Sequence, residues 1–435
     1  MKGRALLCLY EFFFSGRPQS LRWSESLRLL SQRGWEIDVL TIEPAEGHPQ
    51  YNAEIKPFVP ANVRVFKTYP GLIHSLRFAR PLIGNSPLSR AKVLLSDLLN
   101  AFYRTPWYNR TLRQILVPDD AVEWLPFALK AGRRIVEKSD VIISCAPPFT
   151  SHVVGYLLKR LSKKPWIAYY DDPWTIGPWM FWVKGLRPVR RHLDRKLEEK
   201  LLRSTDKIIV VTEETKEAYL AHFPFLRPEN LAVISYGFNA EEFRRVKARG
   251  SSKFRIVYTG FFYERDAHGF FRALKGLKDL PLEVIIVGNI DPAVSQYLRY
   301  VEREELSPMV TFLGGQPHNA VISLQKGATV LLSFGWPGGL QIPCKIFEYI
   351  GAKRPVLAIR YDDKDAAAKL IMKLNRGIVV DNEPIKIEQA IRQLYKLWRT
   401  NTLVKRFNLE PVEQFSWAKL GEKLEETILD TLGKS

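Results

Sequence analysis

The chain alternates short apolar runs with segments whose apolar residues recur every three or four positions. Runs of the first kind are typical of strands buried on both faces, and segments of the second kind are typical of helices. Because the two kinds alternate along the whole chain, the pattern predicts an α/β protein with two parallel, doubly wound sheets. Strands are predicted at 4–10, 35–42, 62–67, 140–146, 166–170, 206–212, 231–235, 254–259, 282–288, 310–314, 330–334, 355–359 and 375–381.

The length of 435 residues suggests two domains of ordinary size. The segment 244–253 is polar and basic, contains a glycine, and lies between the seventh and eighth predicted strands. We therefore expect residues 1–243 to form an N-terminal Rossmann-like domain and residues 254–408 to form a C-terminal one. An amphipathic helix follows in the segment 409–435.

The formal charge of +19 is concentrated in the first half of the chain. Residues 51–200 hold 25 lysines and arginines against 12 acidic residues, a net charge of +13. Such a region suits anionic lipid headgroups or phosphorylated acceptors. Nucleic acid is disfavoured as a partner because the sequence carries no recognition motif for it. A basic but otherwise ordinary globular protein explains the charge equally well.

The three cysteines are widely spaced and lie in or beside apolar runs, so they indicate neither a disulfide framework nor a metal site: Cys8, Cys145 and Cys344. The N-terminus enters a strand-like run directly, without the pattern of a signal peptide. No apolar run approaches the roughly 18 residues of a membrane span. These features predict a cytoplasmic protein, either free or peripheral on the inner face of the cell membrane.

One segment of the basic region combines leucines at helical spacing with arginines. Leu94, Leu95 and Leu98 begin it, and Trp107 and Tyr108 follow. A basic amphipathic segment can lie on a membrane surface, where Trp and Tyr suit the lipid–water interface. The alternative is a helix that packs on its own domain.

Residues 330–359 carry the most informative pattern in the sequence. It reads as a buried strand, a loop, a helix and a second buried strand. In such a unit the helix N-terminus and nearby backbone N–H groups bind anions beyond the carboxyl end of the strand. Lys345 and Glu348 are three residues apart, so they share a face of the helix. The loop is rich in residues that allow close backbone approach: Gly335, Pro337, Gly338 and Gly339.

This stretch resembles the donor-sugar motif of the retaining glycosyltransferase family GT4, whose fold is called GT-B. Glu348, followed by Pro355, matches the family glutamate that grips the ribose of the nucleotide, and the loop with Gly339 matches the one around the sugar and phosphates. Where the family often has an earlier glutamate, this chain has Leu340. The resemblance implies two Rossmann-like domains facing a central cleft, with residues 409–435 returning to the N-terminal domain.

Three motifs of the first half resemble the same family. The glycine-containing opening loop implies a donor-binding Gly16, with Arg22 as a further candidate. The turn after the strand at 140–146 resembles the family's SxPP turn and makes His152 a catalytic candidate, although a lone histidine in a first helical turn is often structural. The sequence DDPW implies acceptor binding by Asp171 and Trp174 and a base-like role for Asp172; a capping role for the aspartates is the alternative.

The second half supplies further donor-site candidates. Gly260 opens the turn after the strand at 254–259, and Arg265 fits the family arginine that binds the donor diphosphate. A guanidinium suits this task because its planar fork matches phosphate oxygens. Gly314 follows the strand at 310–314, where the family backbone often holds the nucleotide base. Lys345 would add a second cation to the diphosphate.

The resemblance predicts a nucleotide-sugar-dependent glycosyltransferase of the hexosyltransferase type. It would move a sugar from a UDP- or GDP-sugar to a hydroxyl of a glycan or lipid-linked acceptor, with retention, in cell-surface polysaccharide or glycolipid synthesis. No cofactor is expected, and a metal is unnecessary if cations neutralise the leaving diphosphate. Two alternatives stay open: another enzyme on the same fold, such as a sugar-nucleotide epimerase or a phosphorylase, and a non-catalytic scaffold on a membrane surface.

Overall fold

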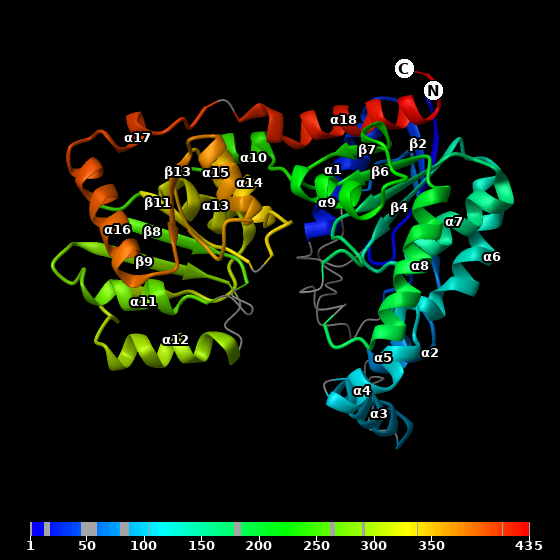
Figure 1. Cartoon of the computed structure of the whole chain (residues 1–435), viewed down its shortest axis with the longest axis horizontal. Helices are drawn as coiled ribbons and strands as arrows, with labels where there is room; N and C mark the ends of the chain where they lie inside the picture. Colours follow the sequence, from blue (N-terminus) through cyan, green and yellow to red (C-terminus); the bar gives the residue numbers. More distant parts are fainter. Residues whose placement is uncertain are drawn as a thin grey trace. The chain divides into compact units, whose positions relative to one another are not determined.

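A computed structural model describes residues 2–12, 18–44, 59–78, 87–103, 105–177, 184–261, 266–288, 292–336, 338–410 and 412–434. The chain divides into two compact units, shown in Figure 1. The N-terminal unit comprises Met1–Ser235 with Leu420–Ser435, and the C-terminal unit comprises Tyr236–Lys419. Each unit is described by itself below.

The N-terminal unit is built on a seven-stranded sheet with the order β3-β2-β1-β4-β5-β6-β7. Its strands and the elements after them are β1 (Gly3–Cys8), α1 (Pro18–Gln32), β2 (Trp35–Ile42), β3 (Val63–Thr68), α2 (Leu72–Arg77), α3 (Pro87–Tyr103), α4 (Pro106–Arg110), α5 (Leu112–Ile115), η1 (Asp120–Trp124), α6 (Leu125–Val136), β4 (Val141–Ala146), α7 (Thr150–Ser162), β5 (Trp166–Tyr170), α8 (Pro188–Ser204), β6 (Lys207–Val210), α9 (Glu213–His222), η2 (Pro228–Asn230) and β7 (Leu231–Val233).

The C-terminal unit is built on a six-stranded sheet with the order β10-β9-β8-β11-β12-β13. Its elements are α10 (Ala240–Arg245), β8 (Phe254–Thr259), α11 (His268–Lys275), β9 (Leu282–Val287), α12 (Pro292–Arg303), β10 (Val310–Phe312), α13 (His318–Gly327), β11 (Val330–Phe334), α14 (Cys344–Gly351), β12 (Val356–Arg360), α15 (Ala366–Lys373), β13 (Gly377–Asp381), α16 (Pro384–Arg399), α17 (Leu403–Arg406) and η3 (Glu413–Phe415); the last helix of the chain is α18 (Trp417–Thr431).

Every strand pair in the two sheets is parallel, as the alternation of strands and helices predicted. The prediction of an α/β protein with two doubly wound parallel sheets is confirmed. Each of the thirteen strands in the described ranges overlaps a predicted one. In both sheets the strand order reverses beside the first strand, β1 or β8, and loops at the carboxyl ends of strands near such a point bind ligands in open α/β sheets.

Side chains of the C-terminal sheet are buried on both faces, which explains why its strands read as continuous apolar runs. Along β8, Ile256 and Tyr258 pack into one core with side chains of α11, α12 and α16. Val257, between them, packs on the other face with side chains of α13 and α14. The helices therefore cover both faces of the sheet (Figure 1).

Most of α18 belongs to the N-terminal unit, where it lies against α1 and the start of β2. A Cβ atom on Gly421 would lie 2.6 Å from Leu29 Cδ1, so a glycine permits the close approach of α18 to α1. The buried carboxylate of Glu425 accepts a hydrogen bond from Trp35 Nε1 at 2.9 Å and pairs with Lys2 and Arg33, each at 2.8 Å. The last helix of the chain is thus an integral part of the first unit.

Candidate active site

Three glycines form a row at the carboxyl ends of adjacent strands in the C-terminal unit. Gly260 follows β8, Gly288 follows β9 and Gly314 lies just beyond β10, and each has a positive φ. The N–H of Gly260 donates to Val287 O at 2.8 Å, and that of Gly288 donates to Gly314 O at 2.9 Å. A Cβ on Gly288 would lie 2.0 Å from Gly260 O, so only glycine lets these backbones meet.

Lys345 lies in the first turn of α14, at the same end of the sheet. Its side chain is buried, and its Nζ lies 3.8 Å from the centroid of the Tyr258 ring. A Cβ on Gly260 would lie 2.9 Å from this Nζ, so the glycine leaves room for the lysine. An ammonium group over an aromatic face, next to backbone that can approach closely, is a suitable place for an anionic group such as a phosphate.

Glu348 is one turn further along α14 and half-buried. The fully buried Gln325 of α13 donates from Nε2 to Glu348 Oε2 at 2.8 Å and to Thr259 Oγ1 at 3.1 Å. Tyr349 supports the same corner, because its hydroxyl accepts from Thr259 N at 2.9 Å and donates to Leu332 O at 3.2 Å. Glu348 is therefore held in one orientation by side chains from β8 and α13.

Burial and most of the neighbouring polar groups shift the pKa of Glu348 in opposite directions. Burial raises the pKa of the Glu348 carboxyl, while the hydrogen bond from Gln325 and the charges of His318 and Lys345 oppose this rise. His318 lies at the start of α13, where its Nε2 is 3.3 Å from Glu242 Oε2, and this hydrogen bond raises the pKa of the imidazole. A histidine and two carboxylates thus lie close together beside Gln325.

The loop between β11 and α14 is fastened to the start of α15. Gly339 has a φ of +26°, and a Cβ on it would lie 2.5 Å from Asp365 Cα. Its carbonyl oxygen accepts a hydrogen bond from Ala366 N at 2.9 Å. Asp365 in turn caps α15 by accepting from the N–H groups of Ala367 and Ala368. Close packing of two backbones therefore explains the glycine at this position.

In the N-terminal unit a buried ion pair lies between α1 and the carboxyl end of β5. Arg22 and Asp171 are both buried and form this pair, and the Arg22 guanidinium lies 4.8 Å from the centroid of the Tyr169 ring. Cys145 Sγ donates to Asp171 Oδ2 at 3.3 Å, and Gln19 Nε2 donates to that sulfur at 3.1 Å. Asp171 is therefore held by Arg22 and Cys145, and acceptor binding by Asp171 stays a prediction.

Asp172, the next residue, is half-buried. Burial raises the pKa of its carboxyl to about 7, against the lowering effect of the Arg22 charge. A carboxyl with this pKa exchanges its proton near neutral pH, which is the range in which a general base acts most effectively. The base-like role of Asp172 stays a prediction, and its raised pKa makes that role testable by pH.

His152 and Trp174 lie in the core of the N-terminal unit. His152 is completely buried, its Nδ1 lies 2.8 Å from Ser144 Oγ, and burial lowers its pKa to about 3. Trp174 is also buried and stacks on Phe149, with ring centroids 4.6 Å apart. Both side chains are thus enclosed by protein groups, and the catalytic role of His152 and the acceptor contact of Trp174 stay predictions.

The structure brings together three of the predicted donor-site residues, Gly260, Lys345 and Glu348, and the glycine row connects Gly260 to Gly314. Gly16 and Arg265 lie outside the described residues, as does Pro337 of the Gly-rich loop. Sequence reasoning missed Gln325 and Gly288. A glutamine inside an apolar helix face was the one signal for Gln325, whereas Gly288 was taken as the end of a strand.

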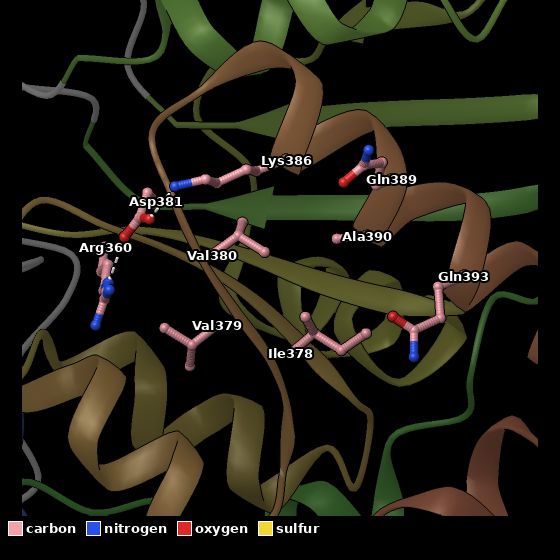
Figure 2. A pocket seen from close by; sticks show the side chains of 9 residues that line it. All are labelled: Arg360, Ile378, Val379, Val380, Asp381, Lys386, Gln389, Ala390 and Gln393. Atoms are coloured by element: carbon pink, nitrogen blue, oxygen red, sulfur yellow. Dashed lines mark hydrogen bonds and ion pairs between the residues drawn. The ribbon is translucent and has the colours of Figure 1, made fainter.

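A separate hollow of about 300 Å³ lies on the C-terminal unit beside β13 and α16 (Figure 2). Its charged side chains satisfy one another, because Asp381 pairs with Arg360 at 2.7 Å and with Lys386 at 2.6 Å. None of the residues predicted for the site lines it. The hollow is therefore distinct from the predicted donor site.

Comparison with known proteins finds a partial family match and a shared fold. Residues 97–242 match the model of Glycosyltransferase Family 4. This match covers about a third of the chain, nearly all of it in the N-terminal unit, so this part of the chain resembles that family. No curated protein sequence matches the chain.

The chain shares the GT-B fold with solved structures at low sequence identity. Sucrose-phosphate synthase from Thermosynechococcus elongatus is 15% identical, with a TM-score of 0.70 and 100% of both chains covered. HepE from Anabaena, solved with UDP and glucose, is 13% identical, with a TM-score of 0.63, and the match covers 98% of this chain and 100% of HepE. A putative UDP-N-acetylglucosamine 2-epimerase from Listeria monocytogenes is 11% identical, with a TM-score of 0.56, and covers 100% of this chain and 98% of its own.

Proposed function

We propose that this protein is a glycosyltransferase, which moves a sugar from a nucleotide-sugar donor to an acceptor hydroxyl with retention of configuration. The observation that carries the proposal is the arrangement around α14, where Lys345, Gly260 and a firmly held Glu348 lie at the carboxyl end of the C-terminal sheet. A diphosphate needs cations and backbone N–H groups, and a ribose needs a fixed hydrogen-bond acceptor. The start of α14 offers a cation in Lys345 and a fixed hydrogen-bond acceptor in Glu348.

Each group has a part in the proposed reaction. Lys345, with Arg265, would stabilise the charge that develops on the leaving diphosphate, and Glu348 would accept hydrogen bonds from the ribose hydroxyls. The backbone around Gly314 would contact the base, and the loop with Gly339 would contact the sugar. In the N-terminal unit Asp172 would take the proton of the acceptor hydroxyl.

The donor we propose first is a UDP-sugar, because HepE, which shares the fold, was solved with UDP and with UDP-glucose. A GDP-sugar is the alternative. The acceptor would be a glycan or a lipid-linked glycan in cell-surface polysaccharide or glycolipid synthesis, and the work would be done at an anionic membrane surface. No metal is required in this proposal, so full activity is expected in the presence of a chelator.

Substitution of the donor-site charges tests the proposal. Glu348→Ala and Arg265→Ala should each lower kcat/KM for the nucleotide sugar by roughly a hundredfold or more, because each loses a hydrogen-bonded, charged contact to the donor. Glu302→Ala and Arg299→Ala are matched controls, since both side chains are exposed on α12. Normal turnover in both donor-site variants, with folding intact, would refute the assignment.

Two other functions make distinct predictions. A sugar-nucleotide epimerase, the description given to the Listeria neighbour, would convert a nucleotide sugar without any acceptor. A non-catalytic scaffold would bind no nucleotide in calorimetry and would still bind liposomes. Release of UDP or GDP that depends on added acceptor would exclude both.

A further inference from the structure

Helix α3 contacts its own unit through polar groups. Ser96 Oγ and Asn100 Nδ2 both donate to the carbonyl oxygen of Arg77, at 2.5 and 2.8 Å. The Arg77 guanidinium lies 3.7 Å from the centroid of the Tyr103 ring. With α4, the helix lies at one end of the N-terminal unit, next to α2 (Figure 1).

The apolar side of α3 faces solvent instead. Leu94, Leu95 and Leu98 are 61%, 40% and 58% exposed. At 100° per residue these three positions form one stripe, on the side opposite Asn100. A helix that merely covers its own domain buries its apolar stripe and exposes its polar one. The orientation of α3 is the reverse, so this stripe is available to something outside the unit.

An aromatic residue continues the stripe onto α4. Trp107 is 59% exposed, and its ring lies 5.3 Å from that of Phe102 at the end of α3, in an edge-to-face contact. Trp has an apolar ring with one polar N–H and concentrates at lipid–water boundaries. Leucines with an adjacent exposed tryptophan are the composition of a surface that enters the headgroup region.

The charge of this segment is complementary to an anionic bilayer. Residues 87–116 contain five arginines and lysines and one acidic residue, a net charge of +4. Among them, Lys92 and Arg110 are exposed. No helix in the described part of the chain is long and apolar enough to cross a membrane. A second protein copy would repel this charge, whereas anionic lipids attract it.

We propose that the exposed face of α3 and α4, defined by Leu94, Leu95, Leu98, Phe102 and Trp107, is a docking surface for an anionic lipid membrane. The leucines and Trp107 enter the interface while the nearby cations contact the headgroups. This extends the proposed function, since it assigns the part of the chain that brings the enzyme to a membrane, but the face itself is independent of the donor site.

Vesicle flotation tests the docking surface. The full-length protein should float with vesicles of phosphatidylglycerol and phosphatidylcholine, and much less with phosphatidylcholine alone. The double variant Leu94→Gln, Leu98→Gln should lower the partition coefficient about tenfold or more, because it removes two apolar side chains from the interface. Leu161→Gln with Leu193→Gln is the matched control, since these leucines of the same unit are 54% and 49% exposed.

Two results overturn the proposal. The first is equal flotation of the wild type, the α3 variant and the control, or no flotation of any of them. The second is a wild-type dimer in light scattering that the α3 variant converts to a monomer, without vesicle binding, because the occupant is then a second copy. Calorimetry of UDP and GDP binding to the same proteins distinguishes failure of this proposal from failure of the proposed function. A loss of nucleotide binding would count against the donor site and would say nothing about the α3 and α4 face.

Discussion

At the scale of single residues, Gln325 fixes the orientation of Glu348. Its amide joins the carboxylate to Thr259, so the group proposed to accept a hydrogen bond from the ribose is held in place by the protein itself. Binding to a group that is already fixed avoids the entropic cost of ordering it. Gln325 touches Glu348 and not the bond that breaks, so it is a positioning residue.

Gln325→Leu should therefore raise the KM for the donor and the Kd for the nucleoside diphosphate by about tenfold, because the hydrogen bond to a charged group is lost, while kcat changes little. Gln325→Glu should weaken binding further, since a second carboxylate then faces Glu348. Calorimetry and steady-state kinetics measure both effects. The control is Gln393→Leu, an exposed glutamine on α16. Equal losses in kcat and in donor affinity would contradict a positioning role.

Asp172 gives a pH dependence with a defined sign. Its raised pKa of about 7 means that the carboxyl is mostly protonated, and inactive as a base, below that pH. If Asp172 accepts the acceptor proton, kcat/KM should rise with pH and level off above about 7. Asp172→Asn should lose about a hundredfold or more in rate and should lack this rising limb. A profile of unchanged shape in the variant would remove Asp172 from the mechanism.

His152 marks the limit of sequence reasoning at this scale. Its position after two prolines in the first turn of a helix was read correctly, since α7 begins at Thr150. The sequence gives no indication of its burial, because burial depends on Ser144, Trp166 and Tyr170, which come from two strands, β4 and β5. The sequence around a single histidine does not predict which residues of other strands surround it.

At the scale of elements, the strands were predicted well from apolar runs. A parallel strand that is buried on both faces has no polar face, so its sequence is apolar throughout. The order of strands in the sheet was not readable in the same way. Gly260 and Gly314 were singled out separately, yet their connection runs through Gly288, which is adjacent only because β9 lies between β8 and β10. Loops that meet at the edge of a sheet come from segments far apart in sequence. The sequence therefore predicted single residues of the site but not which of them are neighbours.

Glu198 links α8 to α9 and to the loop after β5, and its burial predicts how stability changes with pH. Its fully buried carboxyl accepts from Thr175 N at 3.1 Å and from Tyr219 Oη at 2.8 Å, and burial raises its pKa to about 7. The folded state therefore holds the proton more tightly than the unfolded state. This contribution to stability is complete below the unfolded pKa, near 4.5, and is lost as the pH rises through 7.

The loss should amount to about 3 kcal/mol of unfolding free energy between pH 4.5 and 8. Urea unfolding of the wild type and of Glu198→Gln across this range isolates the effect, because the glutamine cannot titrate. The difference in unfolding free energy between the two proteins should shift in favour of the variant as the pH rises. A constant difference across the range would show that Glu198 keeps the same proton occupancy in both states.

At the scale of the whole molecule, the end of the chain packs against its first residues and completes the N-terminal unit. Residues 420–435 belong with residues 1–235, and Glu425 connects α18 to Lys2, Arg33 and Trp35. The apolar periodicity predicts a helix near the end of the chain, but only the resemblance to GT-B proteins suggested its destination. Contacts between residues about 390 positions apart in sequence leave no local pattern.

Glu425→Ala should consequently destabilise the N-terminal unit alone. The substitution leaves the buried Trp35 Nε1 without its acceptor and removes two ion pairs, at a cost of about 2–4 kcal/mol in that unit's unfolding free energy. Thermal unfolding with excess UDP assigns the transitions, because a ligand of the C-terminal unit raises only the Tm of that unit. Glu426→Ala, an exposed neighbour on α18, is the control. Since the proposed donor groups lie in the other unit, Glu425→Ala should bind UDP with wild-type affinity. Weaker binding would mean that the two units do not fold independently.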